Sequence, residues 1–387
     1  MINTKKRTLI FSFDGTGNEP SDSGKFEEDE SISNVMKLNI LMGGGFHKDD
    51  SGTMTPEGNQ QITYYYNGIG TRNIDEWIKC IPLLGWLISK IESFINMTFA
   101  PKFGDVEEIM DEAMKDFEET QYEPGDTLAV FGFSRGAALA RKFAARVLAK
   151  NKNCKVSFLG VFDTVAAMDG VHRKGEHISS DVVFENGTLN KSIARAVHIV
   201  SLDENRIGFA PTLINKDKDD SKRILEVWFP GVHSDIGGGY WFDGLSDVAL
   251  DFMIKECKCE LGDRIHIADG KDPSAIRMLI EKQKNELSVC EVDDVVINPI
   301  FRGVEHLHSK KWKRLGGLKS RVVCVNDKDR PSENENDFPV VHISVKERFN
   351  TVANYRPRAL RGLKFKILDN EGKITPNPIN GISELRQ

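Results

Sequence analysis

The sequence predicts an α/β fold with a mainly parallel central sheet and helices on both of its faces. Five apolar, β-rich runs occur in the first 240 residues, and segments expected to form helices lie between them. The runs are continuously apolar, which is typical of strands buried on both faces. Four of them bring a residue capable of catalysis to their carboxyl end, and a parallel sheet gathers such residues along one edge. We expect the functional site at that edge.

The expected strands leave enough sequence between them for crossover helices. In chain order they are TLIFSFDGT, DTLAVFGFS, KVSFLGVFD, ARAVHIVSLD and ILEVWFPGVH, and the residues at the carboxyl ends of four of them are Asp14, Ser134, Asp163 and His233. The clearest helices are expected over residues 105–120 and 136–150.

At 387 residues the chain is long enough for one large domain with insertions, and we expect a single α/β-hydrolase-like domain over 1–387. Residues 20–60 are rich in Ser, Gly, Asp and Glu, which predicts a polar loop around one short helix. A second insertion is expected at 77–100. Beyond about residue 250 the pattern becomes helical and charged, which predicts a C-terminal extension with one strand-like segment at 338–345.

The composition excludes several classes of protein. With 52 basic and 58 acidic residues the formal net charge is −6, which argues against a general electrostatic grip on nucleic acid. Six cysteines are too sparse for a disulfide framework, and Cys257 and Cys259 alone do not make a zinc site, so we expect no metal and no cofactor. The start of the chain lacks the apolar core of a secretory signal, and no apolar run reaches about twenty residues, which predicts synthesis in the cytoplasm without a membrane span.

The most specific motif is GFSRG at 132–136, which lies between an expected strand and an expected helix. In a nucleophile elbow the serine occupies a strained turn between these elements, and glycines two residues away on either side prevent collisions with the neighbouring backbone. The alternative is an ordinary glycine-rich turn. The strand before the motif, the helix after it and the small residues Ala137 and Ala138 favour Ser134 as a nucleophile.

A serine hydroxyl needs a general base, and the base needs an acid that fixes its tautomer. His233 follows the last of the five strands, in the glycine-rich segment FPGVHSDIGGGY, and is the predicted base. Asp163 and Asp203 follow the third and the fourth strand and compete for the role of the acid. The commonest form of the fold places the acid after the later strand, which favours Asp203, but spacing does not decide between them. The alternative for either aspartate is to cap a turn or a helix.

The opening segment TLIFSFDGTGNEP is expected to help stabilise an oxyanion. In α/β-hydrolases one oxyanion donor is the amide of the residue after the nucleophile, here Arg135, and another comes from a loop after a second central strand. Gly15 or Thr16 is expected to supply this second amide. Asp14 is expected to orient the loop or Arg135, and its alternative role is to form a hydrogen bond within its own turn.

Several segments together resemble a known family, the predicted lipases of the α/β-hydrolase class that include the first class of type VI secretion phospholipase effectors. They run from about residue 8 to about residue 363 in the family's order and are FDGTGN, YYYNGIGT, PGDTLAVFGFSRGAALAR, GVFDTVA, LDENRIGFAPTL, VWFPGVHSDIGGGY, VVHISVKERF and NYRPRAL. Two departures are Gly17, where family members often carry Trp, and the little room left for the membrane-anchoring module that several effectors carry.

The resemblance implies hydrolysis of phospholipid or another ester by a serine, an aspartate and a histidine. These correspond to Ser134, Asp163 and His233. Because the family places its acid in the FDTV segment, the expected acid moves from Asp203 to Asp163, and Asp203 and Asp235 take supporting or substrate-side roles. The resemblance also implies secretion without a cleaved signal peptide, with the secretion apparatus or an immunity protein as a partner.

Residues 77–100, WIKCIPLLGWLISKIESFINMTFA, have an amphipathic helical pattern. They are expected to form a lid or an interfacial helix in peripheral contact with a membrane, and the alternative is a helix that packs in the core. Two other functions stay open for the chain. One is a soluble esterase or thioesterase with a small acyl substrate, and the other is a hydrolase-like scaffold that binds partners without catalysis.

Overall fold

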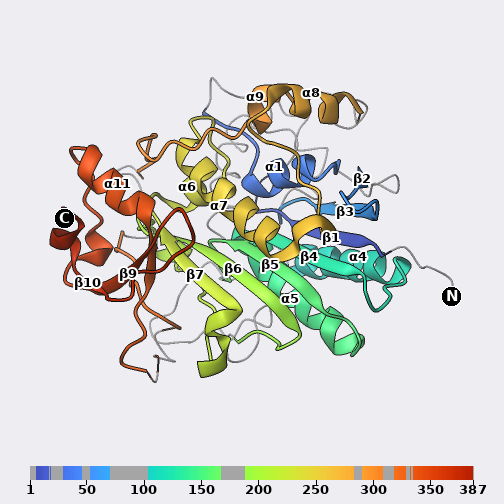
Figure 1. Cartoon of the computed structure of the whole chain (residues 1–387), viewed down its shortest axis with the longest axis horizontal. Coiled ribbons are helices and arrows are strands. Elements are labelled where there is room, and N and C mark those ends of the chain that lie inside the picture. Colours follow the sequence, from blue (N-terminus) through green and yellow to red (C-terminus); the bar gives the residue numbers. More distant parts are fainter. Residues whose placement is uncertain are drawn as a thin grey trace.

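A mainly parallel sheet forms the centre of the fold (Figure 1). The computed structural model describes residues 6–16, 18, 29–45, 53–69, 103–166, 188–282, 290–307, 318–327, 332 and 334–386. Within these ranges ten strands are ordered β10-β9-β8-β7-β6-β5-β4-β1-β3-β2. They are β1 (Thr8–Phe13), β2 (Thr53–Met54), β3 (Gln60–Tyr66), β4 (Thr127–Phe133), β5 (Val156–Phe162), β6 (Ile193–Ser201), β7 (Ile224–Phe229), β8 (Val340–His342), β9 (Lys364–Leu368) and β10 (Ile379–Asn380). Only the edge strands β2 and β10 pair antiparallel with their neighbours, and the predicted fold class is confirmed.

Helices cover both faces of the sheet (Figure 1). They are α1 (Asn34–Leu41), α4 (Phe103–Glu119), α5 (Ser134–Lys150), α6 (His233–Gly237), α7 (Gly244–Leu261), α8 (Pro273–Lys282), α9 (Val292–Val295) and α11 (Ile343–Thr351). Alternate residues of β1 belong to two separate clusters of buried apolar side chains. Leu9 and Phe11 pack with α4 and α5, whereas Ile10 packs with α1, α7, α8 and α9. Both faces of the central strands are thus covered, which explains their continuous apolar runs.

The segment beyond residue 250 contributes strands as well as helices. It contains most of α7, then α8, α9 and α11, and it also extends the sheet past β7 with β8, β9 and β10, each five residues or shorter. A third apolar cluster forms here between β8, β9 and α11, with Trp228 of β7 at its inner side. The extension is therefore an integral edge of the sheet.

The region expected as a polar insertion at 20–60 contains α1, and all eight residues of this helix are buried. Ser33 caps it, because its hydroxyl oxygen accepts a hydrogen bond from the amide of Met36 at 3.1 Å. The helix contacts α7, and apolar residues of both helices belong to the same core cluster. The second expected insertion, 77–100, falls outside the described residues, and so does its proposed lid.

A buried charge ties α1 to α7. Lys37 of α1 has no exposed surface, and its Nζ lies 2.5 Å from Asp243 Oδ2 and 3.1 Å from Asp247 Oδ1. Burial raises the pKa of Asp247 to about 6, with the Lys37 ammonium opposing the rise. Removing one partner of such a group leaves the other charge buried without compensation.

We expect Lys37→Met to lower the free energy of unfolding by about 3–5 kcal/mol at pH 8, measured by urea denaturation. The loss should shrink as the pH falls from 8 toward 6, because without the Lys37 ammonium the pKa of Asp247 lies above its wild-type value of about 6, so the carboxyl takes up a proton earlier in the variant. Lys142→Met is the matched control, since Glu107, its partner at 3.0 Å, is half exposed and such pairs contribute about 1 kcal/mol or less. Equal losses in the two variants would contradict the assignment of a buried charge cluster.

Candidate active site

Ser134 lies in a tight turn between β4 and α5. It is the first residue of α5, and its φ of 57° falls in the left-handed region that non-glycine residues rarely adopt. A Cβ at Gly132 would lie 2.6 Å from the carbonyl oxygen of Gly136, and one at Gly136 would lie 2.2 Å from that of Asp14. Side chains at these two positions would collide with backbone, so the GFSRG motif has the local geometry of a nucleophile elbow.

The structure brings Ser134, His233 and Asp163 together at the carboxyl ends of β4, β7 and β5. His233 Nε2 is 2.8 Å from Ser134 Oγ, and His233 Nδ1 is 2.5 Å from Asp163 Oδ2. All three residues are buried, and none is more than 5% exposed. Such a series can move a proton from the hydroxyl to the imidazole while the carboxylate stabilises the imidazolium that forms.

Asp163 is held from several sides. Its Oδ1 accepts hydrogen bonds from the amide of Ser201 at 2.9 Å and from Arg321 Nη1 at 2.5 Å, and its Oδ2 accepts a second one from Arg321 Nη2 at 2.9 Å. Burial alone would raise the pKa of this carboxyl, but the Arg321 guanidinium and His233 outweigh burial and hold the pKa well below its usual value. Asp163 is therefore ionised at any pH near neutrality.

His233 packs against two aromatic rings, and these apolar surroundings favour the neutral imidazole. The rings of Phe133 and Phe209 lie with their centroids 4.7 and 5.0 Å from that of His233. Burial lowers the pKa of His233, and the hydrogen bond and charge of Asp163 compensate only in part. Because Asp163 accepts from Nδ1–H, Nε2 carries the lone pair and accepts from the Ser134 hydroxyl.

The backbone of His233 is positioned by a buried ion pair. Its amide donates to Glu204 Oε2 at 3.1 Å, and the same carboxylate binds Arg206 through Oε1 to Nε at 2.9 Å and Oε2 to Nη2 at 2.8 Å. The LDENR segment, expected to be structural or substrate-side, thus reaches the base through Glu204.

The loop after β1 is organised by Asp14. Its Oδ1 accepts from the Gly15 amide at 2.6 Å, and its Oδ2 accepts from the Ser33 hydroxyl at 2.6 Å and from the Tyr65 hydroxyl. Burial raises the pKa of Asp14, although these hydrogen bonds oppose the rise. Since the Gly15 amide already donates to Asp14, we propose Thr16 rather than Gly15 as the loop's oxyanion donor.

The loop after β1 also lies against the first turn of α5, where Arg135 follows the nucleophile. The carbonyl oxygen of Asp14 lies only 2.2 Å from the position that a Cβ at Gly136 would take, so the two segments are in close contact. The Arg135 side chain is buried, and this burial lowers its pKa to about 10. The amides of Thr16 and Arg135 therefore belong to two segments that meet beside Ser134.

Asp203 and Asp235 occupy supporting positions rather than the place next to His233 Nδ1. Asp203 Oδ2 accepts from the Gly231 amide and from the Tyr355 hydroxyl, both at 2.8 Å. Asp235 Oδ2 accepts from the Val232 amide at 2.9 Å, and its Oδ1 lies 2.5 Å from His306 Nδ1. Both aspartates thus hold the turn that leads into His233.

Sequence reasoning did not find three of the side chains that organise the site, Ser33, Tyr65 and Arg321. Ser33 had a signal, because a serine before an apolar run is typical of a helix N-cap. Tyr65 lies in YYYNGIGT, which entered only through the family resemblance. Arg321 had no such sequence signal, because it lies in a segment without regular secondary structure.

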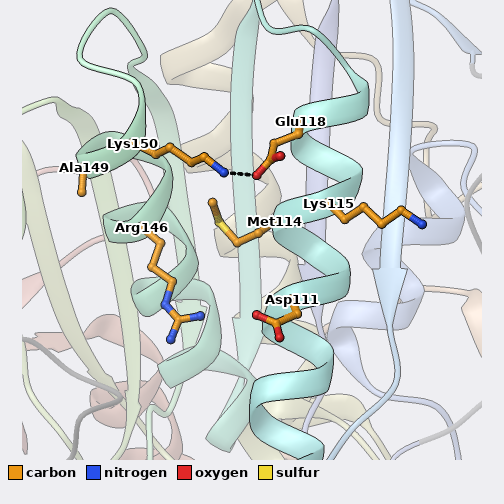
Figure 2. Close-up of a pocket in the computed structure, with 7 residues that line it drawn as sticks. All are labelled: Asp111, Met114, Lys115, Glu118, Arg146, Ala149 and Lys150. Atoms are coloured by element: carbon orange, nitrogen blue, oxygen red, sulfur yellow. Dashed lines mark hydrogen bonds and ion pairs between the residues drawn. The ribbon is translucent and has the colours of Figure 1, made fainter.

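A shallow groove elsewhere in the molecule is separate from this site. It lies between α4 and α5, and Figure 2 shows Glu118 and Lys150 paired across it. Lys150 is the last residue of α5 and Ser134 the first, so the helix separates them by roughly 24 Å. Within the described ranges no helix is long and apolar enough to cross a bilayer, and no cluster of three His, Cys, Asp or Glu side chains could hold a metal ion.

Several solved structures resemble the chain. An uncharacterized protein from Pseudomonas aeruginosa is 22% identical with a TM-score of 0.42, and the match covers 76% of this chain and 51% of that one. The Tle1 effector bound to the VgrG spike of the type 6 secretion system is 25% identical with a TM-score of 0.34 and coverages of 61% and 51%. The NocB thioesterase domain, in a covalent complex with a fluorophosphonate nocardicin G analog, is 14% identical with a TM-score of 0.31 and coverages of 66% and 95%.

The chain spans about half the length of the first two of these structures. No curated protein matches it. A family model, described as the catalytic domain of Tle1-like phospholipase effectors of type VI secretion systems, matches residues 7–150 and 144–256, well over half of the chain. The matched residues include Ser134, Asp163 and His233, and the resemblance drawn from the sequence is confirmed: the chain belongs to the Tle1-like phospholipase effector family.

Proposed function

We propose that this chain is a serine carboxylic-ester hydrolase that cleaves an acyl ester of phospholipids and that it acts as a type VI secretion effector. The observation that carries the proposal is the hydrogen-bonded series from Ser134 through His233 to Asp163. It begins at a nucleophile elbow, in a chain that belongs to a family of phospholipase effectors. This site supports acyl transfer from an ester to the serine hydroxyl.

In the proposed first half-reaction Ser134 Oγ attacks the ester carbonyl carbon while His233 Nε2 takes the hydroxyl proton. The amides of Arg135 and Thr16 are proposed to bind the oxygen that becomes negatively charged. The tetrahedral intermediate then collapses, and the imidazolium gives its proton to the leaving alkoxide. A lysophospholipid departs and the acyl group remains on Ser134.

In the second half-reaction water attacks the acyl-enzyme with His233 again as the base, which releases a fatty acid and restores the serine. Throughout, Asp163 is proposed to keep the imidazole in one tautomer and to stabilise its protonated form. No cofactor or metal ion takes part in these steps.

We also propose partners for this activity. Family membership supports a component of the secretion apparatus as the carrier of the chain and an immunity protein as its inhibitor. The substrate lies in a membrane, so the chain must contact a lipid surface, and residues 77–100 remain the segment proposed for that contact.

The test is to incubate the purified chain with phosphatidylethanolamine and phosphatidylglycerol vesicles and to quantify the products by mass spectrometry. We expect one free fatty acid and one lysophospholipid for each lipid consumed. Parallel assays use a soluble butyrate ester, an acyl thioester and covalent labelling by a fluorophosphonate, which reacts with activated serines.

Each alternative has its own outcome in this panel. Release of the phosphorylated head group would contradict acyl-ester cleavage. Turnover of only the butyrate ester or the thioester would indicate a hydrolase of small acyl substrates. A folded chain that is not labelled by the fluorophosphonate and consumes no substrate would be a binding scaffold.

A further inference from the structure

Arg321 is the one strong positive charge in direct contact with Asp163 among the described residues. Its two terminal nitrogens bind both oxygens of the carboxylate, at 2.5 and 2.9 Å, and the side chain is only 3% exposed. A bidentate pair of this kind fixes the plane of the carboxylate as well as its position. Asp163 also has a φ of 40°, so this contact restrains a residue with an unfavourable backbone conformation.

The same guanidinium joins two further segments at the site. Nη1 donates to the carbonyl oxygen of Ser201 at 2.8 Å, at the end of β6, and Nη2 donates to that of Phe209 at 2.6 Å. The ring of Phe209 packs edge-on against His233. Arg321 therefore connects the acid, the strand beside it and one wall of the base.

The charge of Arg321 acts on the base through the acid. Asp163 Oδ2 lies between His233 Nδ1 at 2.5 Å and Arg321 Nη2 at 2.9 Å, so the guanidinium offsets part of the negative charge that faces the imidazole. Two other charges face His233 from the LDENR segment, Glu204 and Arg206, and they oppose each other. Asp235 lies on the same short helix and is engaged by His306.

We propose that Arg321 is a positioning residue of the catalytic site: it fixes the Asp163 carboxylate against His233 and weakens the attraction of that carboxylate for a protonated imidazole. This inference rests on the proposed function. Arg321 lies beyond residue 256, where the match to the family model ends. The consequence is a base that stays neutral, and therefore active, at mildly acidic pH.

The test is the pH profile of kcat/KM for Arg321→Met on a soluble butyrate ester, with the active fraction set by fluorophosphonate titration. The acidic limb of the profile reports the pKa of the free base. Removing the guanidinium leaves the Asp163 charge uncompensated, which stabilises the imidazolium, so we expect the limb to move to higher pH by about one unit. A displaced carboxylate should also lower the plateau by about ten- to a hundredfold.

The matched control is Arg348→Met. Arg348 is equally buried, pairs with Glu305 at 3.3 Å and donates to the carbonyls of Phe301 and Gly303, but it does not touch Asp163 or His233. Loss of the Arg348 side chain should lower thermal stability without moving the acidic limb of the pH profile. Arg321→Lys keeps the charge without the bidentate fork and should keep the wild-type limb with a reduced plateau.

The outcomes separate this inference from the proposed function. The inference is overturned if the wild type is active but the acidic limb of the pH profile does not move in Arg321→Met. It is also overturned if the limb moves equally in Arg348→Met. A wild type that neither turns over esters nor reacts with the fluorophosphonate overturns the proposed function instead. If Arg321→Met does not fold, Arg321→Gln removes the same charge and retains amide donors toward the carboxylate, and the same upward shift is required of it.

Discussion

Ser134→Ala should lower the rate of ester hydrolysis by about a million-fold, the loss that follows removal of the nucleophile in a serine hydrolase. The reason is local. Ser134 Oγ is the atom proposed to attack the ester, and it lies 2.8 Å from the base. Alanine fits the same turn because its side chain is smaller, and it loses only one hydrogen bond, so the midpoint of thermal unfolding should change by a few degrees at most.

The measurement combines initial rates on the butyrate ester and on vesicles with fluorophosphonate labelling and thermal unfolding. Ser246→Ala is the matched control, because Ser246 is also buried and its hydroxyl donates one hydrogen bond, to the carbonyl of Asp243 at 2.9 Å. We expect Ser246→Ala to keep wild-type rates and labelling. A Ser134→Ala protein that keeps more than a trace of turnover at unchanged stability would mean that another residue is the nucleophile.

The strands that the sequence predicted are those with a strong local signal. β1, β4, β5, β6 and β7, six to nine residues long, are buried on both faces over most of their length, so each consists largely of apolar residues. β2, β3, β9 and β10 were not predicted. The seven-residue β3 begins with Gln60 and Gln61 and so lacks a continuous apolar run, whereas β2, β8, β9 and β10 are only two to five residues long. Strands this short form because a neighbouring strand offers hydrogen-bonding partners, which is a tertiary cause that leaves little trace in the local sequence.

The residues of the candidate site likewise divide into those with a local sequence signal and those without one. Ser134 was predictable because the elbow needs glycines at fixed positions on either side of it. His233 was predictable from its place after a strand. The choice between Asp163 and Asp203 was not, because both follow neighbouring strands, and the direction of a side chain depends on backbone angles such as the φ of 40° at Asp163. Arg321 contacts Asp163 across 158 residues of sequence, a pairing that only the folded chain reveals.

Asp163→Asn should reduce kcat by about ten-thousand-fold, as the equivalent change does in a serine protease, because an amide in place of the carboxylate can hold the imidazole in the wrong tautomer. In this chain the change should also destabilise the fold. Arg321 would stay buried beside a neutral amide, and breaking a buried ion pair from one side costs about 3–5 kcal/mol. Rates must therefore be measured well below the unfolding temperature and normalised to the folded fraction.

Asp203→Asn is the comparison that makes this result informative. The Asp203 carboxylate accepts hydrogen bonds from the Gly231 amide and the Tyr355 hydroxyl through one oxygen, and burial raises its pKa to about 7, with Glu305 adding to the rise. An asparagine can accept the same two bonds through its carbonyl oxygen, and it replaces a group that is already partly neutral near pH 7. We expect a loss of about 1 kcal/mol or less and less than a tenfold change in kcat. If the larger loss of rate instead occurs in Asp203→Asn while both proteins stay folded, Asp203 would be the acid, and the contact between Asp163 and His233 would have only a structural role.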